Sequence, residues 1–149
     1  MMNADTDDET TRPVETVDMY RAVFENTGTG TIIIDHDMTI LFANATFEAM
    51  TGYSRVEIEN TMKWSQFVAP EDLDRMQSYH YGRRNPGAVI PTEYECRILD
   101  KGQNLHYIYM KVGMIPDSKR SIASFMDITE RKRAENRLRE SEAKLSAIV

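Results

Sequence analysis

The run Asp127-Ile-Thr-Glu-Arg131 marks the point at which the sequence changes from a strand pattern to a helix pattern. Before it, apolar and polar residues alternate, as they do in a half-buried strand. After it, the sequence is rich in charge and in strong helix formers. We therefore predict that a strand ends at Ile128 and that a helix begins at Thr129. Asp127 and Glu130, three residues apart, are expected to form a reciprocal capping box at the start of this helix.

The helix predicted over residues 129–149 carries one apolar seam. Its members recur at alternating spacings of four and three residues, as in a coiled coil. They are Ala134, Leu138, Ser141, Leu145 and Ile148. We predict that this seam pairs with a second copy of the chain, giving a homodimer. The alternative is a helix that packs back on the sheet of its own domain. Residues 144–149 also resemble residues 19–24, which fits the start of a following domain.

The region before this helix contains two groups of strands with helices between them. Strands are predicted at residues 31–35, 39–43, 92–99, 105–115 and 121–128. Short helices are expected after Asn44 and Ser54, and a longer one from Pro70 to Gly82, because Asn and Ser favour the N-cap and Pro the first turn. This order predicts an α+β fold, in which a five-stranded antiparallel sheet carries short helices on one face.

The N-terminal residues 1–16 are polar and acidic, and we expect them to form a disordered tail. A short helix that starts at Val17 and stops before Asn26 should follow, because apolar residues recur there at helical spacing. The predicted organisation is therefore a tail at 1–16, one domain at 17–128 and a linker helix at 129–149. The tail carries most of the net charge of −6, so the body has no basic face, and nucleic-acid binding is not expected.

Composition excludes several further classes. The sequence contains no apolar run long enough to cross a bilayer and no secretory signal, so we expect a cytoplasmic segment without direct membrane contact. A lone Cys96 cannot form an intrachain disulfide, and no Cys/His cluster suggests a metal site. No nucleophile elbow or phosphate-binding glycine motif is present. His36 falls in a predicted turn and His106 on a predicted strand, with no partner pattern for catalysis. We expect no catalytic residues and no enzyme.

The order of the elements resembles the PAS family, and four stretches resemble it residue by residue. They are Gly30-Thr-Ile-Ile-Ile-Asp35, Ile40-Leu-Phe-Ala-Asn-Ala-Thr-Phe47, Pro70-Glu-Asp72 and Asp127-Ile-Thr129. The resemblance implies a sensory domain whose last strand passes into a signalling helix. It assigns the signalling linker to Asp127, Thr129 and Glu130.

In PAS domains the ligand pocket lies between the inner face of the sheet and the helices. The resemblance places ten residues nearest to such a pocket: Phe47, Met50, Trp64, Met76, Tyr79, Tyr94, Cys96, Ile108, Met110 and Phe125. The alternative is that these side chains simply fill the core. Tyr79 and Tyr94 are the strongest candidates for ligand contact, because a buried hydroxyl needs a hydrogen-bonding partner.

The sequence identifies no particular cofactor. A covalent flavin adduct needs a cysteine on a helix in a distinctive motif, whereas Cys96 falls on a predicted strand, so we expect a buried thiol and no covalent flavin. A haem sensor needs an axial histidine on the long helix. His80 lies near the end of that helix, where we expect a surface histidine that stabilises the helix terminus, and no haem.

These features predict a sensory input domain of a signal-transduction protein such as a two-component histidine kinase. It would bind a small molecule or dimerise, and pass the change to a downstream output domain of the same chain. The helix at 129–149 contains no histidine, so a phosphoacceptor is not expected in it. The alternative is a ligand-free interaction or dimerisation module that acts as a spacer between domains.

Overall fold

The computed structural model describes the backbone of residues 16–148 and the side chains of residues 16–147. The predicted disordered tail at 1–16 lies outside this range except for Thr16, which belongs to a helix described over residues 16–25. That helix ends before Asn26, as predicted. None of the helices within the described range combines the length and apolar character that a membrane crossing requires.

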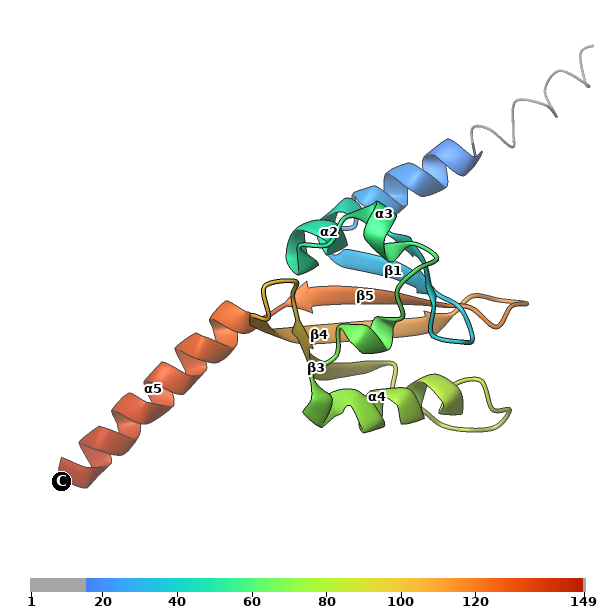
Figure 1. Ribbon diagram of the computed structural model, residues 1–149. Helices are drawn as coiled ribbons and strands as arrows, with labels where there is room; N and C mark the ends of the chain where they lie inside the picture. Colours follow the sequence, from blue (N-terminus) through green and yellow to red (C-terminus); the bar gives the residue numbers. More distant parts are fainter. Residues whose placement is uncertain (1–15, 149) are drawn as a thin grey trace, which may run out of the picture.

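The sheet has five strands, all paired antiparallel, in the order β2-β1-β5-β4-β3. The strands are β1 (Gly30–Ile34), β2 (Ile40–Ala43), β3 (Glu93–Leu99), β4 (Leu105–Met114) and β5 (Ser121–Asp127). The predicted α+β class and strand count are confirmed. The last strand, β5, lies in the centre between β1 and β4, so it joins the first hairpin to the second (Figure 1).

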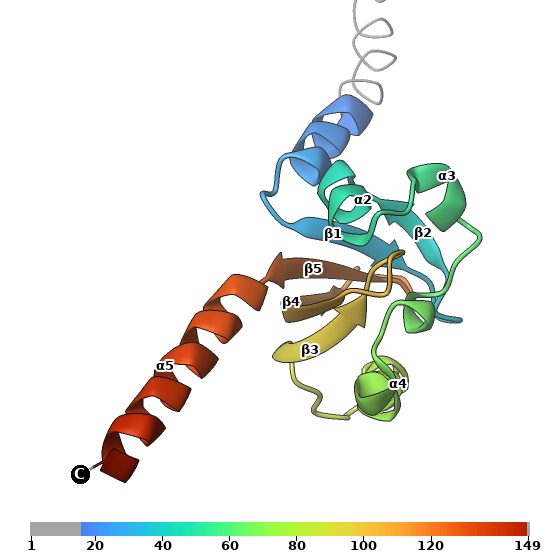
Figure 2. The same ribbon diagram turned by 60° about the vertical axis from the view of Figure 1, so that its left-hand side comes forward.

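The helices between the two hairpins gather over one face of the sheet, as Figures 1 and 2 show. They are α2 (Ala45–Thr51), α3 (Arg55–Ile58), the 3₁₀ turn η1 (Trp64–Gln66) and α4 (Pro70–Gly82). Asn44 caps α2 by accepting the Phe47 N–H, and Ser54 caps α3. The core lies between this layer and the inner face of the sheet, where Ile32, Phe47 and Ile108 are at most 1% exposed.

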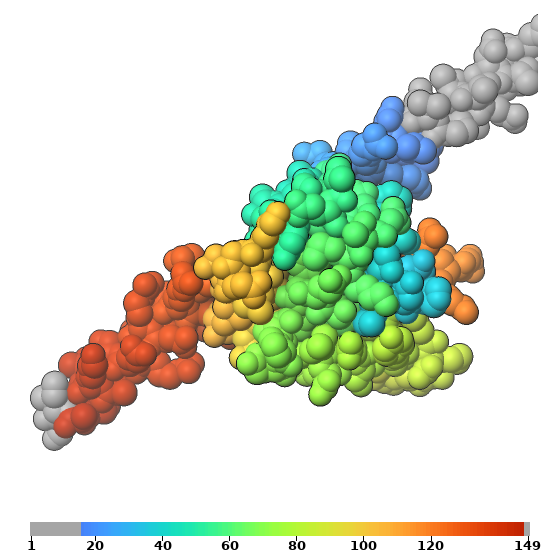
Figure 3. Space-filling view, viewed as in Figure 1, coloured from blue at the N-terminus to red at the C-terminus, as the bar shows by residue number. Residues whose placement is uncertain are grey.

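The last helix, α5 (Thr129–Ile148), extends away from the body of the domain (Figure 3). It does not pack back on the sheet, so that alternative is wrong for the single chain. Leu138 and Leu145 are 61% and 63% exposed, and Ala134 and Ser141 are also exposed. Ile148 belongs to the helix, but its side chain lies outside the described residues. The four members of the predicted seam with described side chains are therefore uncovered in the single chain.

Candidate functional site

A cavity of about 30 Å³ lies between the helices and the inner face of the sheet. Strands and helices from both halves of the chain line it, so it forms only when the two hairpins come together. Six of the ten predicted pocket residues line it: Phe47, Trp64, Met76, Tyr94, Met110 and Phe125. Tyr79 and Tyr94 were the strongest candidates for ligand contact, and of these two only Tyr94 lines the cavity.

The other four predicted residues do not line this cavity. Ile108 is fully buried in the core, and Met50 packs against the core from its edge. The Tyr79 ring, partly exposed, packs edge-on against the Tyr94 ring at 4.9 Å. The Cys96 thiol is buried, with its sulfur 3.2 Å from the Met110 sulfur, and this burial raises the pKa of Cys96 to about 12. Such a thiol stays protonated and unreactive at neutral pH.

His80 was expected at the surface, and this expectation is wrong. It is 4% exposed and lines the cavity, because the last turns of α4 pack beneath the turn after β1. Its Nε2 donates to the His36 carbonyl at 2.8 Å, and its Nδ1 accepts from Arg84 at 3.2 Å. Burial, followed by the nearby Arg84 and Arg83 guanidinium groups, lowers the pKa of His80. The helical spacing of Met76 and His80 was the signal that could have placed it inside.

Eight further lining residues were not predicted: Ile32, Ile34, Phe67, Val68, Arg83, Ile98, Val112 and Ser121. Strand alternation could have found some of them, since Ile98 faces the same way as Tyr94 and Val112 the same way as Met110. Arg83 and Ser121 gave no signal, because a polar residue at the end of a helix or strand is usually solvated.

Two of the residues that line the cavity, Trp64 and Arg83, each have a buried donor without an acceptor. The indole Nε1 of Trp64 and the guanidinium Nε of Arg83 are buried and have no hydrogen-bonding partner within the described part of the chain. The remainder of the wall is mainly apolar, formed by side chains such as Phe47 and Phe125.

The arrangement does not fit a flavin or a haem. A volume of about 30 Å³ takes only a few non-hydrogen atoms. His80, the only histidine in the cavity wall, uses both ring nitrogens in hydrogen bonds, so it presents no free lone pair to a haem iron. Within the described residues, no group of three or more His, Cys, Asp or Glu side chains could hold a metal ion.

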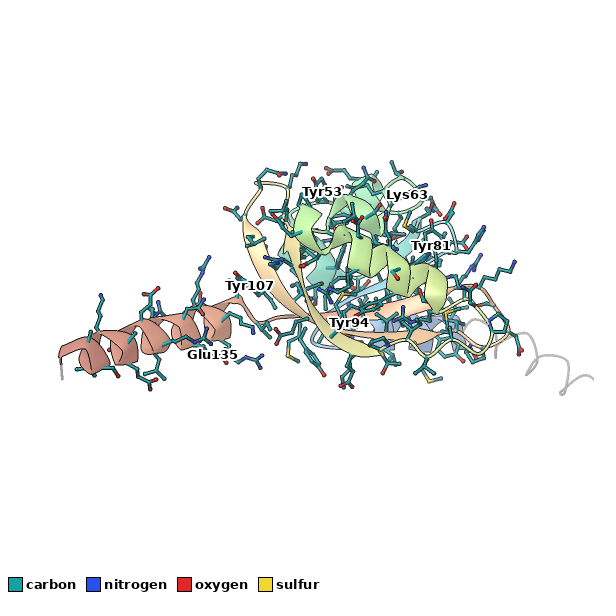
Figure 4. The ribbon with its side chains drawn as sticks, turned by 90° about the horizontal axis from the view of Figure 1, so that it is seen from below. Tyr53, Lys63, Tyr81, Tyr94, Tyr107 and Glu135 are labelled. Carbon is teal, nitrogen blue, oxygen red and sulfur yellow. The ribbon has the colours of Figure 1, made fainter. Side chains whose placement is uncertain are left out.

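A second cluster lies where β5 passes into α5. Asp127 Oδ1 accepts the backbone N–H of Thr129 at 2.9 Å and also the Thr129 hydroxyl. The Thr129 hydroxyl oxygen accepts the Tyr107 N–H from β4 at 3.0 Å. Figure 4 shows Tyr107 beside the start of α5. The predicted reciprocal capping box is wrong: Asp127 accepts the N–H of Thr129 and not that of Glu130, and the Glu130 carboxylate lies 3.7 Å from Arg133. The first turn of α5 is thus tied to β4 as well as to β5.

His106 of β4 completes this junction, although the sequence gave it no partner. Its Nδ1 lies 2.8 Å from Asp127 and its Nε2 2.9 Å from Asp100, so one imidazole bridges two carboxylates. Partial burial alone would lower the pKa of His106, but the hydrogen bonds to Asp100 and Asp127 outweigh it, and the pKa is raised. The hydrogen bond from His106 and that from the Asn104 backbone lower the pKa of Asp100 to about 2.

We predict that His106 stabilises the domain most under mildly acidic conditions. A raised pKa in the folded state gives stability that is fully present below the ordinary value of 6.5 and is lost as pH rises through the raised value. His106→Gln should therefore lower the Tm by several degrees at about pH 6 and by much less at about pH 9. Thermal unfolding followed by circular dichroism measures this, with the exposed His36→Gln as control. An equal loss at both pH values would contradict an ionic role for His106.

Comparison with known proteins identifies a matching family and two related histidine kinases. The PAS fold family matches residues 40–128. Sensor histidine kinase TmoS of Ectopseudomonas mendocina is 25% identical over 130 residues, and cell-division control histidine kinase PdhS of Brucella anthropi is 25% identical over 136 residues. The matches cover 85% and 90% of this chain, which spans 13% of the length of each kinase.

A solved structure shows the same architecture. The PAS domain of an HTR-like protein from Haloarcula marismortui superposes with a TM-score of 0.66 at 21% identity, covering 82% of this chain and 99% of that domain. This likeness concerns the fold, and it includes the five-stranded sheet with its helices on one face. Because the family match spans more than half of the sequence and the folds agree, the chain belongs to the PAS fold family.

Proposed function

We propose that this PAS domain is the sensory input domain of a signal-transduction protein and passes a change in its cavity to an output domain through α5. The observation that carries this proposal is that β4 and β5 both line the cavity and both hold the first turn of α5. A ligand with different affinities for two arrangements of these strands would shift their populations. The domain itself would bind and transmit, without catalysing a reaction.

The path from cavity to helix is short. Met110 of β4 pairs with Phe125 of β5, and both line the cavity. Two residues further along each strand, Ile108 pairs with Asp127, which caps α5. Two residues of strand span about 7 Å. A displacement of the Met110–Phe125 pair should therefore move the Asp127 cap by nearly the same amount. An ion pair between Glu95 of β3 and Lys132 at 2.9 Å adds a third strand to the same connection.

The relatives support a histidine kinase as the parent protein. Both curated relatives carry that description, and each is far longer than this chain. We propose that the output domain lies beyond α5 in the same polypeptide and that the segment works in the cytoplasm. A phosphoacceptor histidine would lie outside residues 129–149, which contain none.

The test of this proposal measures the cavity and the helix separately. Trp64 is the only tryptophan of the chain and lines the cavity, so its fluorescence reports binding directly. For compounds found in a thermal-shift screen of metabolites, we expect changes in Trp64 emission together with changes in hydrogen exchange in the first turns of α5. Thr129→Val should keep the fluorescence response and lose most of the change in α5, because the Tyr107 and Asp127 bonds to the hydroxyl are removed.

The control is Thr61→Val, which removes an exposed hydroxyl that bonds only locally to the Glu59 carbonyl. It should leave both responses unchanged. Compounds that alter Trp64 emission in the unmodified chain without any change in α5 would contradict transmission through this junction. A cavity that no metabolite enters would favour the ligand-free alternative.

That alternative, a dimerisation or spacer module, is favoured by the exposed apolar side chains of α5. Leu138 and Leu145 are more than half exposed, which is costly unless a partner covers them. Pairing with the same seam of a second chain would bury both. Two heptads give only a marginal coiled coil by themselves, so we propose that dimerisation through this seam accompanies sensing and does not replace it.

We predict that Leu138→Asp combined with Leu145→Asp abolishes this dimer. Four aspartates would face one another across the seam of the pair, where charge is strongly disfavoured. Sedimentation equilibrium should show a mass lowered by half relative to the unmodified chain. Ala143→Asp with Ala147→Asp adds the same charge on the opposite side of the helix and should leave the mass unchanged. If the Leu variants retain the mass of the unmodified chain, the seam is not the interface.

A further inference from the structure

One imidazole ring links the turn between β3 and β4 to the start of α5. The Nδ1 of His106 lies 2.8 Å from Oδ2 of Asp127, and its Nε2 lies 2.9 Å from Oδ2 of Asp100. A neutral imidazole carries only one N–H, whereas both ring nitrogens of the protonated form are donors. Both contacts are therefore hydrogen bonds only when the ring is positively charged.

Asp127 carries this link into the helix through its second oxygen. Its Oδ1 accepts the backbone N–H and the hydroxyl of Thr129, while its Oδ2 faces His106. The Thr129 hydroxyl oxygen also accepts the N–H of Tyr107, which follows His106 on β4. The ring and the first turn of α5 are thus joined through one carboxylate and through adjacent residues of one strand.

The two carboxylates depend on this ring for their positive partner. Within the described residues, His106 is the one cationic side chain that pairs with either Asp100 or Asp127. On β3, the residue opposite His106 is the apolar Ile98. The other charged side chains of the β3–β4 turn and of the first turn of α5 are paired elsewhere: Lys101 with Glu57, Glu130 with Arg133, and Arg131 and Lys132 with Glu95.

Loss of the ring proton to water breaks this arrangement. Whichever nitrogen of His106 keeps its hydrogen, the other presents a lone pair to a carboxylate oxygen at hydrogen-bonding distance, so that contact must open. The His106 side chain is 21% exposed, so solvent reaches it. Burial opposes the charge on His106, but the hydrogen bonds to Asp100 and Asp127 outweigh it, and the pKa of His106 is raised above 6.5.

We propose that His106 is a proton switch at the start of α5: the charged ring fastens the first turn of the helix to the β3–β4 turn, and loss of its proton loosens that first turn. This inference rests on the proposed role of α5 as the path to an output domain, and it adds pH as an input that does not pass through the cavity. His80, the histidine in the cavity wall, has a lowered pKa, so the two rings titrate in different pH ranges.

The test follows the ring and the helix in one pH titration of the chain. NMR gives the midpoint of His106, and amide hydrogen exchange gives the protection of Thr129 and of Lys132, whose N–H donates to the Ile128 carbonyl. After correction for the intrinsic pH dependence of exchange, we expect both protection factors to fall by about tenfold. The fall should begin near pH 6.5 and be complete above the His106 midpoint, because stability from a raised pKa is lost over that range.

Two variants separate the charge of the ring from its packing. His106→Gln cannot titrate, so the protection of α5 should no longer depend on pH, whereas the exposed His36→Gln should leave the response unchanged. Asp100→Asn supplies an amide that can donate to the deprotonated ring, so it should lower the His106 midpoint and keep α5 protected at about pH 9. Asp117→Asn removes the same charge from an exposed turn and should alter neither quantity.

The outcomes separate this switch from the sensing function of the cavity. Constant protection of Thr129 while His106 titrates would overturn the switch, and so would an unchanged pH response in His106→Gln. If compounds that enter the cavity still move α5 in either case, the sensing proposal stands without the switch. If pH moves α5 and no compound does, the switch stands and ligand sensing fails.

Discussion

Phe47→Ala is expected to lower the free energy of unfolding by about 3–5 kcal/mol, the cost of removing a buried phenylalanine. Phe47 is 1% exposed, and its ring packs against Phe67 at 5.4 Å and Phe125 at 5.2 Å. These contacts join α2 to β5 and to the segment before α4, so the substitution removes the centre of the core. The total free energy of unfolding of a domain of this size is about 5–15 kcal/mol, so the variant should be close to unfolding.

Urea denaturation followed by Trp64 fluorescence measures this loss. Phe42→Ala is the matched control, because Phe42 lies on β2 but is 51% exposed. It should cost much less than Phe47→Ala. Equal losses for the two variants would show that the aromatic cluster around Phe47 is not the main source of stability.

Asn44→Ala is expected to cost about 2–4 kcal/mol, which combines the loss of a helix cap with buried groups left without partners. Asn44 is completely buried, and its oxygen accepts the N–H groups of Thr31 and Phe47 at 2.9 and 3.0 Å. Its nitrogen donates to the carbonyls of Phe24 and Thr29 at 2.8 and 2.9 Å. One side chain thus connects the helix at 16–25, β1 and α2.

Chemical denaturation gives the size of this loss, and hydrogen exchange gives its location. Protection should fall in α2 and in the helix at residues 16–25, because both lose a partner. Asn136→Ala on exposed α5 should change the stability by no more than about 0.5 kcal/mol. A stability loss for Asn44→Ala as small as that of this control would contradict a connecting role for Asn44.

The two variants also separate folding from signalling. Both residues belong to the layer of helices over the sheet, whereas the transmission path runs through β4, β5 and the Thr129 hydroxyl. A variant of the junction such as Thr129→Val should therefore change the coupling between Trp64 and α5 at a small cost in stability. Variants of Phe47 and Asn44 should change the stability of the whole domain.

The sequence by itself determined the elements of this protein and their order. Strand alternation placed β3, β4 and β5, and Asn44, Ser54 and Pro70 marked the starts of three helices. These signals are local, since a turn, a cap or an alternating strand depends on residues a few positions apart. The order of the elements was sufficient to predict the antiparallel sheet and the family.

Only the tertiary structure decided which side chains meet. His80 entered the cavity because the turn after β1 covers the end of α4, and its carbonyl partner is 44 residues away in the sequence. His106 found Asp127 across the β4–β5 ladder, 21 residues away. Long-range packing fixes such contacts, and no local pattern in the chain encodes them.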